Sequence, residues 1–104
     1  MNIDFSSIFN EMAQNAAQVV EEGGEQLGSE IHRFMERNQD SIAELTTALA
    51  NGEISQDEYE QELSREQYVL EAELIGMEIQ AKSAIQKAVN AAMQVLTSAV
   101  KASL

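Results

Sequence analysis

The sequence predicts an all-α fold, and three observations lead to that prediction. The 104 residues include no proline and only five glycines, so few positions favour a turn. Alanine, glutamate, glutamine, leucine and methionine, which are strong helix formers, recur throughout the chain. Apolar residues repeat at three- and four-residue spacing over long stretches. The chain length predicts a single domain, residues 1–104.

The first helix is predicted over about residues 4–22. Asp4 is suited to its N-cap, because the carboxylate can accept hydrogen bonds from free backbone amides. The Gly23-Gly24 pair ends the helix, either as a kink or as a full reversal of the chain. The sequence leaves these two alternatives open.

The second helix is predicted over about residues 25–50, because its apolar positions stay in phase along the whole stretch. Residues 38–41 contain a possible restart, but the unbroken phase favours one helix. Gly52 is suited to the left-handed position beyond a helix end. Ser55 and Glu58 then have the spacing of a capping box, which predicts a tight turn into the next helix.

The third helix is predicted over about residues 55–102, interrupted only by Gly76. At 1.5 Å per residue such a helix is about 70 Å long. If it pairs antiparallel with the preceding chain, it forms a long helical hairpin in which Gly76 lies near the level of Gly28. A fold-back at this level, giving a compact four-helix bundle of one chain, is the alternative.

Charge divides the chain into three segments. Residues 1–22, 23–78 and 79–104 contribute −4, −11 and +3 to the net charge of −12. The opposite charges of the two terminal segments favour their packing together as a bundle core, with residues 25–78 forming an acidic helical hairpin arm. Because a phosphate backbone or an anionic lipid surface would be repelled, we expect no direct nucleic-acid binding.

The last predicted helix carries a wide alanine-rich apolar face after Met77. The first helix alone is too narrow to cover this face, so the sequence predicts a homo-oligomeric, coiled-coil-like helical bundle formed by the terminal segments. The predicted interface residues are Phe5, Ile8, Phe9, Met12, Ala16, Val20, Ala81, Ala84, Ile85, Ala88, Val89, Ala92, Met93, Leu96 and Val100.

The sequence shows no catalytic motif. It has no cysteine nucleophile, no glycine-rich phosphate loop following a strand, and no serine in a nucleophile elbow. We therefore expect neither an enzyme nor a cofactor. His32 is the only histidine, and it can share a helix face with Glu25 and Glu36. A metal site would need further carboxylates from Glu58, Glu62 or Glu66 of other subunits.

Three functional hypotheses follow. The first is a non-enzymatic, self-associating scaffold, adaptor or small structural subunit. The second is an inhibitor or chaperone-like protein whose acidic face occupies a basic, nucleic-acid-binding site on another protein. That predicted acidic face comprises Glu53, Asp57, Glu58, Glu62 and Glu66. The third is a carboxylate-rich metal-binding bundle.

The sequence contains no apolar run long enough to span a bilayer, and the N-terminal residues lack the basic and apolar regions of a signal peptide. We therefore expect a soluble protein located in the cytoplasm.

Overall fold

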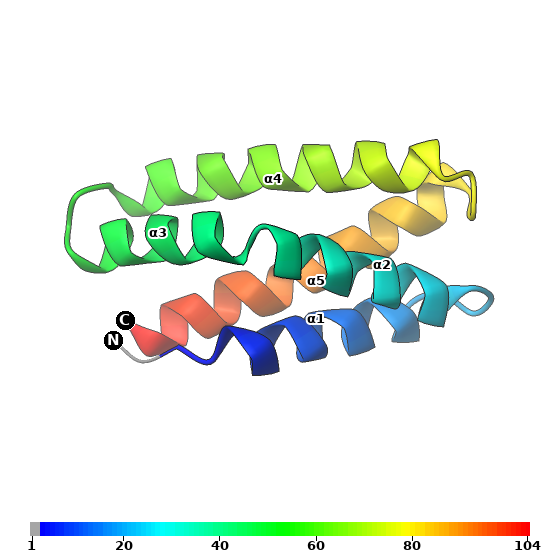
Figure 1. Ribbon diagram of the computed structural model, residues 1–104, viewed down its shortest axis with the longest axis horizontal. Helices are drawn as coiled ribbons and strands as arrows, with labels where there is room; N and C mark the ends of the chain where they lie inside the picture. The colour runs from blue at the N-terminus through cyan, green and yellow to red at the C-terminus, as the bar shows by residue number, and fades with distance from the viewer. Residues whose placement is uncertain (1–2) are drawn as a thin grey trace.

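The computed structural model describes residues 3–104 and confirms the all-α class, because this part of the chain contains helices and no strand (Figure 1). The helices are α1 (Phe5–Gln18), α2 (Gly24–Arg37), α3 (Gln39–Ala50), α4 (Gln56–Gly76) and α5 (Lys82–Ser103).

The start of α1 agrees with the prediction. The Ser7 hydroxyl donates to one Asp4 carboxylate oxygen at 2.8 Å, and the Ser7 backbone N–H donates to the other at 3.2 Å. These hydrogen bonds lower the pKa of Asp4. The predicted end at residue 22 is wrong, since α1 stops at Gln18. Glu21 and Glu22 follow, and negative charge is unfavourable near the negative end of a helix.

The turn between α1 and α2 reverses the chain, and α2 runs back along α1 (Figure 1). Gly23 has φ +77°, a left-handed conformation that suits glycine. The two backbones then approach closely. A Cβ added at Gly28 would lie 2.6 Å from the Ala13 carbonyl oxygen, and one added at Gly24 would overlap the Ala17 carbonyl oxygen. Glycine therefore makes the contact between these helices possible.

The prediction of one helix over residues 25–50 is wrong at a single residue. Asn38 lies between α2 and α3 with φ −107° and ψ 13°. Its side-chain amide donates to the Phe34 carbonyl oxygen at 2.8 Å and so competes with the helical hydrogen bonds. The Ile42 N–H still donates to the Asn38 carbonyl at 3.0 Å, so the apolar phase continues across the interruption.

The turn from α3 to α4 follows the predicted chemistry. Gly52 has φ +74°, and the Glu53 N–H donates to the Ala48 carbonyl at 2.9 Å, as in a Schellman motif. The Ser55 hydroxyl accepts from the Glu58 N–H at 3.1 Å, and the Glu58 carboxylate accepts from the Ser55 N–H at 2.9 Å. This reciprocal pair is the predicted capping box.

The predicted continuous helix over residues 55–102 is wrong. The chain turns between α4 and α5, and Glu78 there has the left-handed φ of 55°. The Gln80 side-chain amide fixes this turn against the α1–α2 turn by donating to the Glu22 carbonyl at 2.7 Å. The longest dimension of the molecule is 41 Å, far short of a 70 Å hairpin.

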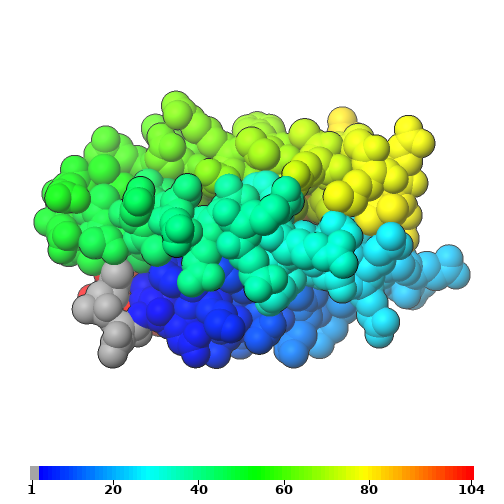
Figure 2. Space-filling model, in the orientation of Figure 1, coloured from blue at the N-terminus to red at the C-terminus, as the bar shows by residue number. Residues whose placement is uncertain are grey.

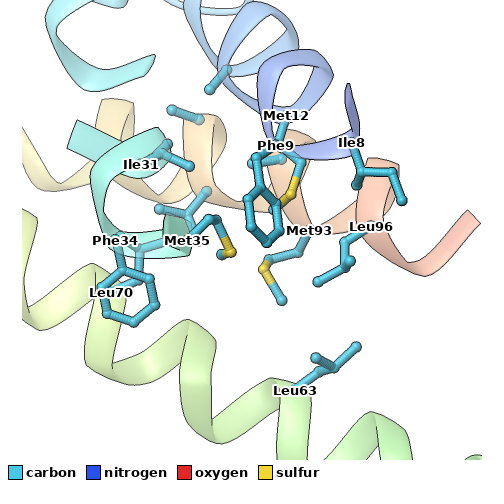
Figure 3. Close-up of a cluster of buried hydrophobic side chains, with 14 of the residues drawn as sticks. Ile8, Phe9, Met12, Ile31, Phe34, Met35, Leu63, Leu70, Met93 and Leu96 are labelled. Atoms are coloured by element: carbon cyan, nitrogen blue, oxygen red, sulfur yellow. The ribbon is translucent and has the colours of Figure 1, made fainter. Parts of the chain in front are cut away.

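The fold-back lets α5 pack against α1, α2 and α4 (Figure 1). Its wide apolar face, which we expected to need a second subunit, is thereby covered within one chain. The radius of gyration of 13.4 Å is close to the value of about 13 Å expected for a compact domain of this length. Side chains from all five helices form the core, with Ile42 as the contribution of α3. Phe9, Met35, Leu63 and Leu96 are among the core side chains seen in Figure 3.

Candidate protein-binding surface

The residues predicted to form an interface between subunits lie mainly in the core of one chain. Ile8, Phe9, Met12, Ala16, Ile85, Ala88, Val89, Ala92, Met93, Leu96 and Val100 are buried; Phe5, Val20 and Ala84 are half-buried, and Ala81 is exposed. A side chain buried inside the chain can contact a second copy only if the helices separate. Assembly through these residues stays a prediction.

The outward side of α4 has no neighbouring helix. Figure 2 shows α4 along the upper edge of the molecule, with no other segment above it. We define the outer face of α4 by its exposed residues Asp57, Glu58, Gln61, Ser64, Arg65, Tyr68, Val69, Ala72 and Ile75. Asp57, Gln61, Arg65, Tyr68, Ala72 and Ile75 follow one another at intervals of three or four residues, so they form a line along the helix. Arg65, in the middle of this line, pairs with Glu62 at 3.3 Å.

The C-terminal half of this outer face is apolar. Tyr68, Val69 and Ile75 are 73%, 54% and 38% exposed, and Ala72 between them is exposed as well. Met77, just beyond the helix, is 43% exposed. Isolated apolar side chains are common on protein surfaces, but these are neighbours on one helix, which makes the group a candidate interaction site.

The N-terminal half of the outer face is acidic. Asp57 and Glu58 are exposed, and Glu53 is exposed in the preceding turn. Within residues 3–104 these three carboxylates form no ion pair. Among the other predicted acidic-face residues, Glu62 lies 3.3 Å from the Arg65 guanidinium, and Glu66 is half-buried. The structure therefore keeps Asp57 and Glu58 together on one exposed surface.

Polar contacts attach the inner sides of α4 to the bundle. The Arg37 guanidinium donates to both oxygens of Glu73, the shortest contact being 2.9 Å, and these hydrogen bonds raise the pKa of Arg37. On the opposite side the Gln67 amide donates to the Asn90 side-chain oxygen of α5 at 2.8 Å. Contacts on both sides of α4 keep its orientation fixed, so the outer face remains directed away from the core.

A buried hydrogen bond joins α3 to α4. The hydroxyl oxygens of Thr46 and Tyr59 are 3.0 Å apart, and both side chains are fully buried. Because the Thr46 hydroxyl donates to the Ile42 carbonyl at 2.7 Å, the Tyr59 hydroxyl must be the donor to Thr46. Burial raises the pKa of Tyr59, and the hydrogen bond to Thr46 acts in the opposite direction.

The third hypothesis placed His32 in a metal site. The structure shows a contact of 3.0 Å between His32 Nδ1 and Glu36 Oε1 on α2. Among residues 3–104, no three His, Cys, Asp or Glu side chains are grouped so that they could hold a metal ion. The metal-binding bundle stays a prediction.

Sequence reasoning did not identify the apolar half of the outer face as a surface. In the sequence, Tyr68 and Val69 are next to the apolar line of Tyr59, Leu63 and Leu70. The pattern therefore indicated that they belong to the edge of the buried face. The signal that distinguishes them is the second line from Tyr68 through Ala72 to Ile75, which repeats at helical spacing on the opposite side of the helix.

The chain matches no protein-family model, no curated protein and no solved structure. In the part of the chain that the structure describes, none of the helices combines the length and apolar character required to cross a membrane.

Proposed function

We propose that the protein is a non-enzymatic binding protein that uses the outer face of α4 to engage a partner protein with a basic surface. This is the second hypothesis from the sequence, in which an acidic inhibitor or chaperone-like protein occupies a basic site. The observation that carries it is the exposed acidic group at the start of α4, where Asp57 and Glu58 have no ion-pair partner within residues 3–104.

The charge of the whole molecule supports the proposal. The net charge is −12, and residues 23–78, which include α4, contribute −11 of it. Such a field attracts a basic partner over about one Debye length, roughly 8 Å at physiological salt. Complementary charge increases association rates and selects between partners more than it increases affinity. The proposed binding should therefore weaken as salt rises.

A matched pair of triple variants tests this proposal. We expect Glu53→Gln, Asp57→Asn and Glu58→Gln together to weaken partner binding, since they remove the three exposed carboxylates at the start of α4 that form no ion pair within residues 3–104. Glutamine at position 58 can still accept the capping hydrogen bond from Ser55. The control combines Glu21→Gln, Glu22→Gln and Glu25→Gln, which remove three exposed charges near the α1–α2 turn.

The measurement is quantitative recovery of bound proteins from cells of the source organism, at low and high salt. Partners held by α4 are lost with the α4 triple variant and retained with the control, although both variants carry the same net charge. Equal recovery with both variants would show that α4 is not the binding surface.

Self-association is the second candidate function, and the exposed apolar residues Tyr68, Val69 and Ile75 are the observation in its favour. Two copies would each bring a net charge of −12, which opposes their pairing at low salt. Mass measurement by light scattering distinguishes the candidates. A dimer that strengthens with salt would favour self-association, whereas a monomer at all salt concentrations would favour a basic partner.

A further inference from the structure

We propose that the partner segment is an amphipathic helix that lies antiparallel along the outer face of α4, with apolar residues toward its N-terminus and lysines or arginines toward its C-terminus. This inference rests on the proposed function and specifies the chemistry of the partner. It starts from the arrangement of the outer face, in which Arg65, paired with Glu62, separates an acidic start from an apolar end along a single helix.

The shape of the surface favours a helix as the occupant. The outer face is one side of a single helix, and from Asp57 to Ile75 it extends about 27 Å at 1.5 Å per residue. Tyr68, Ala72 and Ile75 form an i, i+4, i+7 line with small Ala72 in the middle. Such a row packs into the groove between side-chain rows of a second helix. A partner helix of about five turns covers the whole outer face.

The positions of the charges set the direction of the partner helix. Asp57 and Glu58 lie in the first turn of α4, and no acidic residue belongs to the apolar line at its other end. The basic residues of the partner must therefore lie over the start of α4. Basic residues are most favourable near the C-terminus of a helix, where they complement its dipole. A partner with its C-terminus over the start of α4 runs antiparallel to it.

Two synthetic peptides of identical composition test both the occupant and its direction. The first, about 18 residues long, has leucines at helical spacing in its N-terminal half and four lysines in its last two turns. The second carries the same residues in reverse order, with the lysines in its first two turns. Binding is measured by isothermal titration calorimetry, and the surface used is mapped by backbone amide NMR shifts.

We expect the first peptide to bind at least about fivefold more tightly than the reversed one, with amide shifts concentrated in residues 57–76. Tyr68→Ser should weaken the first peptide about tenfold, because tyrosine is a frequent anchor at interfaces. Val69→Ser should weaken it less. The control is Leu104→Ser, since Leu104 is 57% exposed against 54% for Val69 but lies at the end of α5.

Equal affinity for the two peptides, or shifts centred away from α4, would overturn the inference. So would a homodimer, seen by light scattering, that Tyr68→Ser dissociates, because a second copy would then be the occupant. The failure of this inference is distinct from the failure of the proposed function. If the acidic triple variant loses its partner while Tyr68→Ser retains it, α4 binds a basic surface through charge alone.

Discussion

The two longest helices, α4 and α5, have similar lengths of 21 and 22 residues but different environments. α5 has no acidic residue and packs against α1, α2 and α4, so it is a central element of the core. α4 contains seven acidic residues and leaves its outer face without a neighbour. An apolar stripe therefore has a different environment in each helix: in α5 it is buried and stabilises the fold, whereas on the outer face of α4 it is exposed to solvent.

The same substitution in the two helices tests this contrast most strongly. Ala92 of α5 is fully buried, and Ala92→Glu places an unpaired charge in the core. We expect a loss of at least about 3 kcal/mol in the free energy of unfolding. Ala72→Glu on the exposed face of α4 should change it by less than about 0.5 kcal/mol. Urea denaturation followed by circular dichroism measures both values.

A folded Ala92→Glu protein with unchanged stability would contradict the packing of α5. If that variant instead changed from an oligomer to a folded monomer, the alanine-rich face would be an interface between subunits, as the sequence alone suggested.

The close contact between α1 and α2 gives a second test of the packed side of the molecule. In Gly28→Ala, the added methyl group meets the Ala13 carbonyl, and overpacking of about 3 kcal/mol outweighs a helix-propensity gain of about 1 kcal/mol. The net loss is about 2 kcal/mol. Gly76→Ala, at the end of α4, meets nothing within 4 Å and should stabilise the protein by about 0.4–1 kcal/mol. Thermal unfolding of both variants checks this difference. Equal shifts of the two melting temperatures would contradict it.

The buried hydrogen bond that holds α4 to α3 has a smaller expected effect. Thr46→Val leaves the Tyr59 hydroxyl buried without an acceptor and should destabilise the protein by about 1–2 kcal/mol. Tyr59→Phe should destabilise it less, by about 0.5–1 kcal/mol, because Thr46 keeps its hydrogen bond to Ile42. Urea midpoints of the two variants test the assignment of Tyr59 as donor, and the reverse order would refute it.

The smallest expected effect is a dependence of stability on alkaline pH. The pKa of Tyr59 is raised in the folded state from an ordinary value of 10.0, so the unfolded chain loses this proton first. The contribution of the neutral tyrosine is complete below the unfolded-state pKa and disappears as pH rises through the folded-state pKa. Between about pH 9 and about pH 11, the wild type should therefore lose more stability than Tyr59→Phe. Parallel urea titrations measure the difference, and identical slopes would contradict it.

Local sequence signals predicted the helix ends where side chains act on their own backbone. The Asp4 cap, the Gly52 turn and the Ser55–Glu58 capping box require only residues near each other in the chain. The turn between α4 and α5 gave no such signal, because Glu78 adopts a left-handed conformation that side chains rarely favour. Gly76 alone did not distinguish a turn from a tolerated interruption.

The coverage of the α5 face depended on contacts between distant parts of the chain. The sequence shows how wide the apolar face of α5 is but not how many helices cover it. With the turn between α4 and α5, three helices of the same chain cover the face; without that turn, a second subunit would be needed. The outer face of α4 was obscured for a related reason. Asp57 and Glu58 were visible as acids, but the exposure of Tyr68 depends on the helices that lie on the opposite side of α4.

The different burial of the two tyrosines gives the molecule two optical reporters. The sequence has no tryptophan and two tyrosines, so its intrinsic fluorescence comes from Tyr59 and Tyr68 alone. Tyr59 is fully buried and Tyr68 is 73% exposed. Acrylamide should quench the emission of Tyr68 and leave that of Tyr59 nearly unchanged until the chain unfolds. In a Tyr59→Phe background, protection of the remaining emission from acrylamide reports occupancy of the α4 surface directly, without an attached dye.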